Sequence, residues 1–135
     1  MVKIESNSST IHKSSLEVFE FLSLPANYES LMPSKVRSFS STETEATLDI
    51  EGIGTVQLAI TEKVSPAKIV MLPQNKVPFK FDIQWDIITI NDSESTVQAV
   101  INADLNFMMK MMAEKLLKDF LDVQIHKLTK QLYAE

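Results

Sequence analysis

The chain has 135 residues, of which 44% are apolar and 23% are charged, a balance typical of an ordinary globular protein. This length favours a single domain over residues 1–135, with a core large enough to need no disulfides. Cysteine is absent and the net charge is −5, which excludes a thiolate nucleophile and a Cys-ligated metal site and argues against a nucleic-acid partner.

The N-terminal part is predicted to hold one strand followed by two short helices. Residues 2–11 are expected to form the strand, although Ser and Asn make its alternation weak. Ser14 and Glu17 match a capping box at a helix start, and this helix should end before Pro25. Pro25 can then begin a second short helix, which Pro33 closes.

Apolar and polar residues alternate with a period of two through the middle of the chain. This alternation predicts antiparallel strands with one buried face, because the turns are too short for parallel crossovers. Gly52 and Gly54, the only two glycines, predict a tight hairpin turn. The expected strands cover residues 46–51, 56–61, 68–72, 79–87 and 96–105.

Residues 107–133 contain no proline or glycine and predict one long helix. At about 100° per residue, this helix has one broad apolar face. That face carries Met109, Ala113, Leu116, Leu117, Phe120, Leu121 and Leu128. It must pack against another apolar surface, and the inner face of the predicted sheet is the only large one left.

This order of elements resembles that of the START-like superfamily, also described as Bet v 1-like or polyketide cyclase-like (SRPBCC). The segments SSLEVFEFL at residues 14–22, PANYE at 25–29 and LNFMM at 105–109 are also similar to bacterial members. The resemblance covers essentially the whole chain. It implies an α+β helix-grip fold, in which a curved antiparallel sheet wraps around a long C-terminal helix, with two short helices after the first strand.

The resemblance also implies a cavity between helix and sheet. Members bind lipids, sterols, quinones, polyketides or plant hormones, and some are enzymes. Periodicity alone does not distinguish a filled core from a hollow one, so the cavity rests on the resemblance. The candidate ligand-binding residues are those on the inward faces: Leu48, Leu58, Phe81, Ile83, Trp85, Ala99, Ile101, Met109, Ala113, Leu116 and Phe120.

Trp85 is the only tryptophan, and it lies on the predicted inner face. A buried indole N–H needs a hydrogen-bond partner from the protein, from water or from a ligand. Trp85 is therefore either an ordinary core residue or part of a pocket wall. In the second case its fluorescence would report the entry of a ligand.

No catalytic constellation is evident in the sequence. His12 and His126 are expected on the surface, and no spacing typical of a metal site is present. Asp82 and Asp86 fall on the wet face of the clearest strand, whereas acid–base catalysis needs a titratable group inside the site. Loop residues could still reach a pocket from its rim: Asn27, Tyr28, Asn75 and Lys76. We expect no metal and no cofactor.

The segment Phe107–Met112 holds four of the seven methionines. Met108 and Met111 fall away from the apolar face of the helix, whereas Met109 falls on it. Flexible thioethers suit adaptable apolar surfaces. The segment either packs beneath the preceding loops, lines a pocket mouth, or contacts a membrane or a partner.

Three functions therefore remain open. The first is the binding of a small hydrophobic molecule such as a lipid, isoprenoid, quinone or polyketide. The second is a cyclase, dehydratase or hydrolase acting on such a molecule. The third is a protein-interaction module without a ligand. The first ten residues do not resemble a signal peptide and no apolar run is long enough to span a bilayer, so we expect a cytoplasmic protein.

Overall fold

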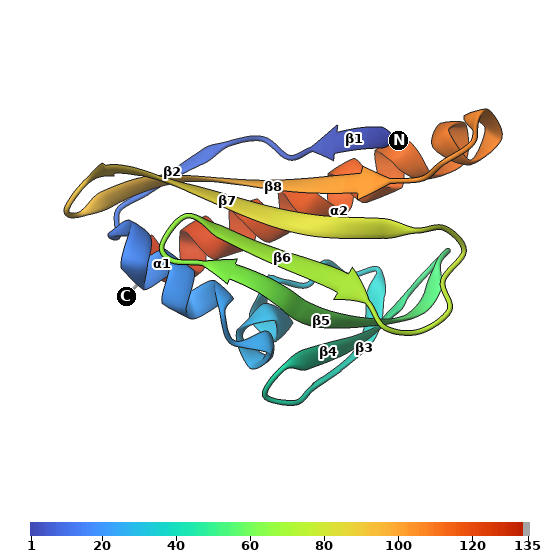
Figure 1. Ribbon diagram of the computed structural model, residues 1–135, viewed down its shortest axis with the longest axis horizontal. Coiled ribbons are helices and arrows are strands. Elements are labelled where there is room, and N and C mark those ends of the chain that lie inside the picture. The colour runs from blue at the N-terminus through green and yellow to red at the C-terminus, as the bar shows by residue number, and fades with distance from the viewer. Residues whose placement is uncertain (134–135) are drawn as a thin grey trace.

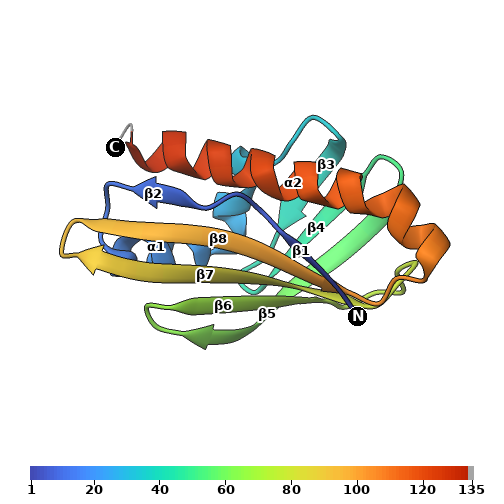
Figure 2. The ribbon, with the colours of Figure 1, turned by 90° about the horizontal axis from the view of Figure 1, so that it is seen from above.

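The computed structural model describes residues 1–133 and has the expected α+β helix-grip architecture, in which a curved sheet wraps around a long helix (Figures 1 and 2). The strands are β1 Val2–Glu5, β2 Ser9–Ile11, β3 Val36–Ser41, β4 Glu45–Ile50, β5 Gly54–Val64, β6 Lys68–Pro73, β7 Phe81–Asn91 and β8 Glu94–Ala103. The helices are α1 Ser15–Leu22, the 3₁₀ helix η1 Pro25–Leu31, and α2 Phe107–Tyr133.

All strand pairs in the sheet are antiparallel, as the alternation predicts. The order is β1-β8-β7-β6-β5-β4-β3, with β2 also pairing with β8. Strands β3 to β8 are therefore neighbours both in sequence and in space. In the centre, Ile83 of β7 lies opposite Met71 of β6 and Ile101 of β8, and Trp85 lies opposite Ala99. These pairs fix which side chains meet on the inner face.

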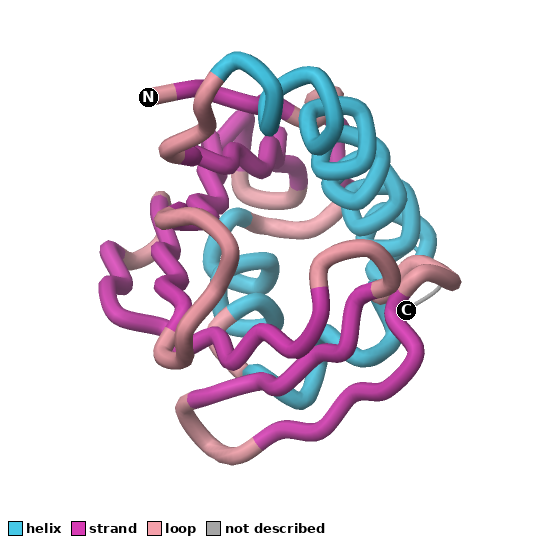
Figure 3. The backbone as a smooth tube through the Cα atoms, turned by 90° about the vertical axis from the view of Figure 1, so that its right-hand side faces the viewer, coloured by secondary structure: helices cyan, strands magenta, loops and turns pink. Residues whose placement is uncertain are grey.

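Helix α2 lies on the concave side of the sheet (Figure 3). Its buried residues follow the helical period and meet the inner face of the sheet: Leu117, Phe120, Leu121, Ile125, Leu128 and Leu132. The first turns of α2 extend past the end of the sheet (Figure 2). There Phe107, Met108, Met111 and Met112 are 71–79% exposed. Packing beneath the preceding loops, one interpretation of the Met-rich segment, is therefore wrong for these four residues, whereas Met109 is half-buried.

The start of α1 is fixed by the predicted capping box. The Glu17 backbone N–H donates to Ser14 Oγ at 3.2 Å, and the Ser14 N–H donates to Glu17 Oε1 at 3.4 Å. Helix α1 ends at Leu22, before Pro25, and Pro25 opens η1 as expected. The two short helices close one end of the concave face, where they contact α2 and the sheet.

The structure differs from the sequence-based expectation at both sheet edges. The single strand expected over residues 2–11 is wrong: it is divided at Ser6, whose Oγ accepts a hydrogen bond of 2.9 Å from the Ala99 N–H. Strand β3 was not predicted, because few of its side chains are buried and its sequence VRSFSS lacks a clear alternation. Phe79 precedes β7, which begins at Phe81. Within residues 1–133, no helix has the length and apolarity that crossing a bilayer requires.

Candidate functional site

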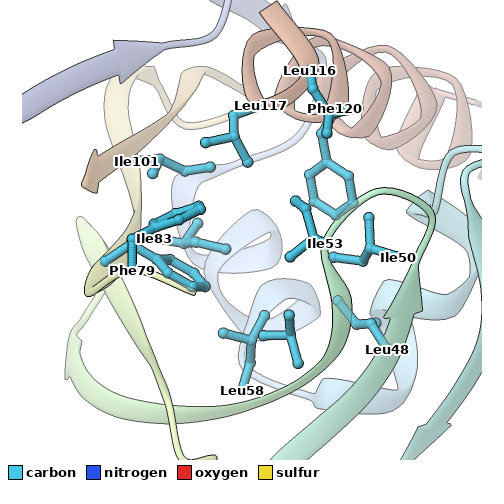
Figure 4. A pocket seen from close by; sticks show the side chains of 12 residues that line it. Leu48, Ile50, Ile53, Leu58, Phe79, Ile83, Ile101, Leu116, Leu117 and Phe120 are labelled. Atoms are coloured by element: carbon cyan, nitrogen blue, oxygen red, sulfur yellow. The ribbon is translucent and has the colours of Figure 1, made fainter. Parts of the chain in front are cut away.

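An apolar cavity lies between the inner face of the sheet and α2 (Figure 4). Its walls are Leu48, Ile50, Ile53, Val56, Leu58, Phe79, Phe81, Ile83, Ile101, Leu116, Leu117 and Phe120. Every one of these side chains is a hydrocarbon. The volume of this cavity is about 30 Å³, whereas one water molecule needs about 10–15 Å³. The side chains therefore nearly fill the interior in this conformation.

The rim of this outer cavity is built by three separate segments. Ile53 comes from the hairpin between β4 and β5, Phe79 from the loop before β7, and Leu116 from α2 (Figure 4). All three are half-buried. By contrast, the floor residues Leu48 and Leu58 are buried. The exposure gradient places the entrance of the cavity between the two loops and the N-terminal half of α2.

A second cavity, called the inner cavity below, adjoins the first and has a volume of about 10 Å³. That volume is close to the least that one water molecule needs. The walls are Tyr28, Met32, Phe39, Ala46, Leu48, Leu58, Met71, Ile83, Trp85, Phe120 and Gln124. The two cavities share four of these side chains: Leu48, Leu58, Ile83 and Phe120. Together the cavities form one interior, which those four side chains divide.

Polar atoms enter the interior only at the inner cavity, among the residues that line either cavity. The Tyr28 hydroxyl donates a hydrogen bond of 2.7 Å to the Leu22 carbonyl oxygen. Burial raises the pKa of this hydroxyl above its usual value, so it stays protonated at neutral pH. Trp85 Nε1 and Gln124 Oε1 are buried and have no hydrogen-bond partner among the described residues.

The predicted site residues fall into three groups. Most of them line the outer cavity: Leu48, Leu58, Phe81, Ile83, Ile101, Leu116 and Phe120. Trp85 lines the inner cavity. Three residues lie outside the walls of both: Ala99 is buried opposite Trp85 on β8, while Met109 and Ala113 are half-buried on the N-terminal part of α2.

Sequence reasoning missed Gln124 and two rim residues, Ile53 and Phe79. Gln124 is one of the few polar residues on the buried face of α2, four positions after Phe120, and only 3% of it is exposed. A polar residue within an otherwise apolar helical stripe is the signal that could have found it. Ile53 lies in a hairpin turn, where periodicity gives no information. Phe79 belongs to the strand expected over residues 79–87 but was not named as a site residue, and in the structure it precedes β7.

Three of the four polar residues named for the rim make hydrogen bonds within the fold, and the fourth, Lys76, is exposed. Asn27 Nδ2 donates to the Phe21 carbonyl oxygen at 2.8 Å, and Asn75 Nδ2 donates to the Thr55 carbonyl oxygen at 2.8 Å. Tyr28 is buried rather than at the rim. His12 Nδ1 lies 3.3 Å from Glu94 Oε2 on the surface, and His126 is also exposed. Within residues 1–133, no three His, Cys, Asp or Glu side chains gather as a metal site would require.

No protein-family model and no curated protein sequence matches the chain. Solved structures do match. A START superfamily protein from Mycobacterium smegmatis superposes with a TM-score of 0.74 at 12% identity, over 98% of this chain and 97% of that one. Norcoclaurine synthase from Thalictrum flavum, in complex with dopamine and hydroxybenzaldehyde, gives 0.78 at 8%, over 99% and 87%. The di-domain ARO/CYC BexL of the BE-7585A biosynthetic pathway gives 0.72 at 10%, over 96% and 46%.

These matches, together with the sheet order and the long α2, define an α+β protein of the helix-grip class. The chain has the START/Bet v 1-like fold, as its order of elements predicted. The identities are low, so the likeness extends to the fold alone, and activity must be argued from the site.

Proposed function

We propose that the protein binds a small hydrophobic molecule in the interior between the sheet and α2. The observation that carries this proposal is the outer cavity, whose walls are entirely hydrocarbon and whose rim is half-buried. An apolar molecule that enters it gains about 25 cal/mol for each Å² of apolar surface removed from water. The class of ligand is a lipid, isoprenoid, quinone or polyketide-like molecule.

The present volume of the cavity sets a condition on binding. Pockets for drug-sized ligands occupy about 300–1,000 Å³, far more than the side chains leave open here. Ile53, Phe79 and Leu116 must therefore turn outward when a ligand enters, and Phe120 must move for a ligand to reach the inner cavity. The rim segments are two loops and the lightly packed part of α2, so these movements cost less there than in the floor.

The fold relatives support this assignment. The Thalictrum flavum structure holds dopamine and hydroxybenzaldehyde, two small aromatic molecules. A catalytic role of the kind found in some members is the alternative. It receives less support here, because the only titratable side chain that lines either cavity is Tyr28, whose hydroxyl is already bonded to the Leu22 carbonyl.

Titration of Trp85 fluorescence with a panel of lipophilic molecules tests the proposal. Trp85 is the only tryptophan and lines the inner cavity, so a ligand that enters should shift or quench its emission. Leu116→Glu places a charge at the rim and should abolish the response. Leu24→Glu is the matched control, because Leu24 is 56% exposed and lines neither cavity. An unchanged spectrum across a chemically diverse panel would contradict ligand binding.

The exposed apolar turns at the start of α2 favour a second candidate, a protein-interaction module. Phe107, Met108, Met111 and Met112 form one exposed apolar segment, and such segments often mark contact sites. A stable protein partner that copurifies with the chain, and is lost with Met108→Glu, would support this candidate. Retention of that partner by Met108→Glu would count against it.

A further inference from the structure

Two residues that line the inner cavity each carry a buried polar atom without a hydrogen-bond partner among the described residues. Trp85 Nε1 carries a hydrogen that it can donate, and Gln124 Oε1 can accept one. Trp85 is 0% exposed and Gln124 is 3% exposed, and neither atom has a hydrogen-bond partner among the described residues. Such groups are rare in native cores, because each costs the desolvation of a polar atom.

The neighbouring polar groups do not satisfy this pair. The Tyr28 hydroxyl donates to the Leu22 carbonyl oxygen at 2.7 Å, and the ring of Tyr28 meets Trp85 only through its edge. Lys127 Nζ donates to the Met32 carbonyl oxygen at 2.7 Å. The remaining walls of the inner cavity are apolar side chains. A donor and an acceptor are therefore available to a hydroxyl-sized group in this cavity.

Two parallel rows of side chains connect this pair to the rim. On α2, Leu116, Phe120 and Gln124 follow at intervals of four residues, so the row is about 12 Å long. On β7, Phe81, Ile83 and Trp85 follow at intervals of two, which gives about 13 Å. The first member of each row lines the outer cavity, the second lines both cavities, and the third lines the inner one. The rows therefore enclose a slender apolar path that ends at two polar atoms.

We infer that Trp85 Nε1 and Gln124 Oε1 anchor the hydroxyl group of an amphiphilic ligand whose apolar body lies along this path toward the rim. A hydroxyl oxygen accepts from the indole N–H while its own hydrogen is donated to the glutamine oxygen, so one group satisfies both atoms. The inner cavity, at about 10 Å³, is about the size of one water molecule or hydroxyl group. This inference rests on the proposed function and narrows it to apolar molecules with one buried hydroxyl.

The test compares three probes with equal numbers of non-hydrogen atoms: 1-decanol, 1-methoxynonane and undecane. The alcohol can donate and accept, the ether can only accept, and the alkane can do neither. Affinities for the full chain are measured by native mass spectrometry and calorimetry for the wild type and Gln124→Leu. The control is Gln131→Leu, a glutamine of the same helix that lines neither cavity.

Gln124→Leu should weaken the binding of 1-decanol about tenfold, and leave 1-methoxynonane and undecane nearly unchanged. Trp85→Phe should weaken the alcohol and the ether but not the alkane. Gln131→Leu should change none of the three affinities. Each comparison is made for one probe between variants, so differences in the hydrophobicity of the probes cancel.

Two results would overturn the anchor, and they differ in what they mean for the proposed function. If the wild type binds all three probes and Gln124→Leu changes their affinities alike, the anchor is wrong and the apolar pocket stands. If the wild type binds none of them, the pocket itself fails and the anchor fails with it. The unfolding midpoint of free Gln124→Leu should not fall, which separates a lost contact from a misfolded chain.

Discussion

The ring of Tyr28 meets the ring of Trp85 edge-on, with their centroids 6.1 Å apart and their planes at 66°. The Tyr28 hydroxyl donates to the carbonyl oxygen of Leu22, which is the last residue of α1. One side chain of η1 thereby joins the end of α1 to the centre of β7. This junction forms a wall of the inner cavity, so the two short helices fix the deep end of the site.

The buried Tyr28 hydroxyl should make stability fall at high pH. Burial raises the pKa of this hydroxyl in the folded protein. The stability that the protonated Tyr28 contributes is therefore fully present below the unfolded pKa of about 10, and it is lost as the pH rises above that value. Above about pH 10, Tyr28 is ionised in the unfolded chain but still protonated in the folded one. The free energy of unfolding should fall by about 1.4 kcal/mol per pH unit.

Tyr28→Phe removes this decline, because phenylalanine has no proton to lose. Near neutral pH the variant should be less stable by about 1 kcal/mol, since a buried hydrogen bond is lost. Urea unfolding of both proteins between about pH 8 and pH 11 measures the difference. Other groups that titrate there are common to both proteins. A difference that stays constant with pH would contradict the burial of the hydroxyl.

Gln124→Leu should stabilise the free protein. The wild type leaves Gln124 Oε1 buried without a partner among the described residues, which costs about 1–3 kcal/mol. Leucine has a similar volume and no polar atom, so the free energy of unfolding should rise by about 1 kcal/mol. Denaturant unfolding measures it, with Gln131→Leu as the reference. A loss of stability would mean that Gln124 is satisfied in solution.

Phe120→Leu should join the two cavities, because Phe120 is one of the side chains that line both. The smaller side chain should cost about 1–3 kcal/mol of stability through lost packing. Longer apolar ligands should bind more tightly, since less of the wall has to move. Titration with alcohols of increasing chain length checks this.

The control for Phe120→Leu is Leu121→Ala. Leu121 is fully buried on the same helix and lines neither cavity. Its truncation should destabilise the protein by about 2–5 kcal/mol without changing the preferred chain length. Equal effects of the two variants on ligand preference would show that general loosening, rather than the dividing position of Phe120, controls the interior.

Local patterns were enough to predict most of the elements. Helix α2 covers Phe107–Tyr133, the segment expected to be helical, because its apolar period and the lack of Pro and Gly are properties of that segment alone. The break at Ser6 was not predictable in this way. It depends on a hydrogen bond to Ala99, a residue on β8 far along the chain. Strand β3 likewise owes its form to pairing with β4.

The site was only partly predictable for a related reason. Alternation identifies inward residues such as Phe81 and Ile83, but it contains no information on how completely their side chains fill the interior. The volume left open depends on the rotamers of residues from many separate elements and from the loops between them. Whether Gln124 Oε1 has a hydrogen-bond partner also depends on how the core packs. Periodicity could show only that a polar residue lies on the apolar face of the helix.

The hairpin between β4 and β5 offers a test of the rim that separates backbone strain from side-chain contact. Gly52 and Gly54 have φ angles of +89° and +103°, which residues with a Cβ rarely adopt. Replacing either by alanine should therefore cost about 1–2 kcal/mol of stability. A Cβ at Gly52 would lie 3.7 Å from Leu116 Cδ2, whereas a Cβ at Gly54 would meet nothing within 4 Å.

Only Gly52→Ala should slow the entry of a ligand. Its methyl group restricts the outward turn of Leu116 that an open rim requires, while Gly54→Ala carries a similar strain without that contact. Stopped-flow measurement of Trp85 fluorescence after mixing with 1-decanol gives the association rate of each variant. Equal slowing in both would assign the effect to strain in the hairpin. Unchanged rates in both would mean that the ligand enters without passing between Gly52 and Leu116.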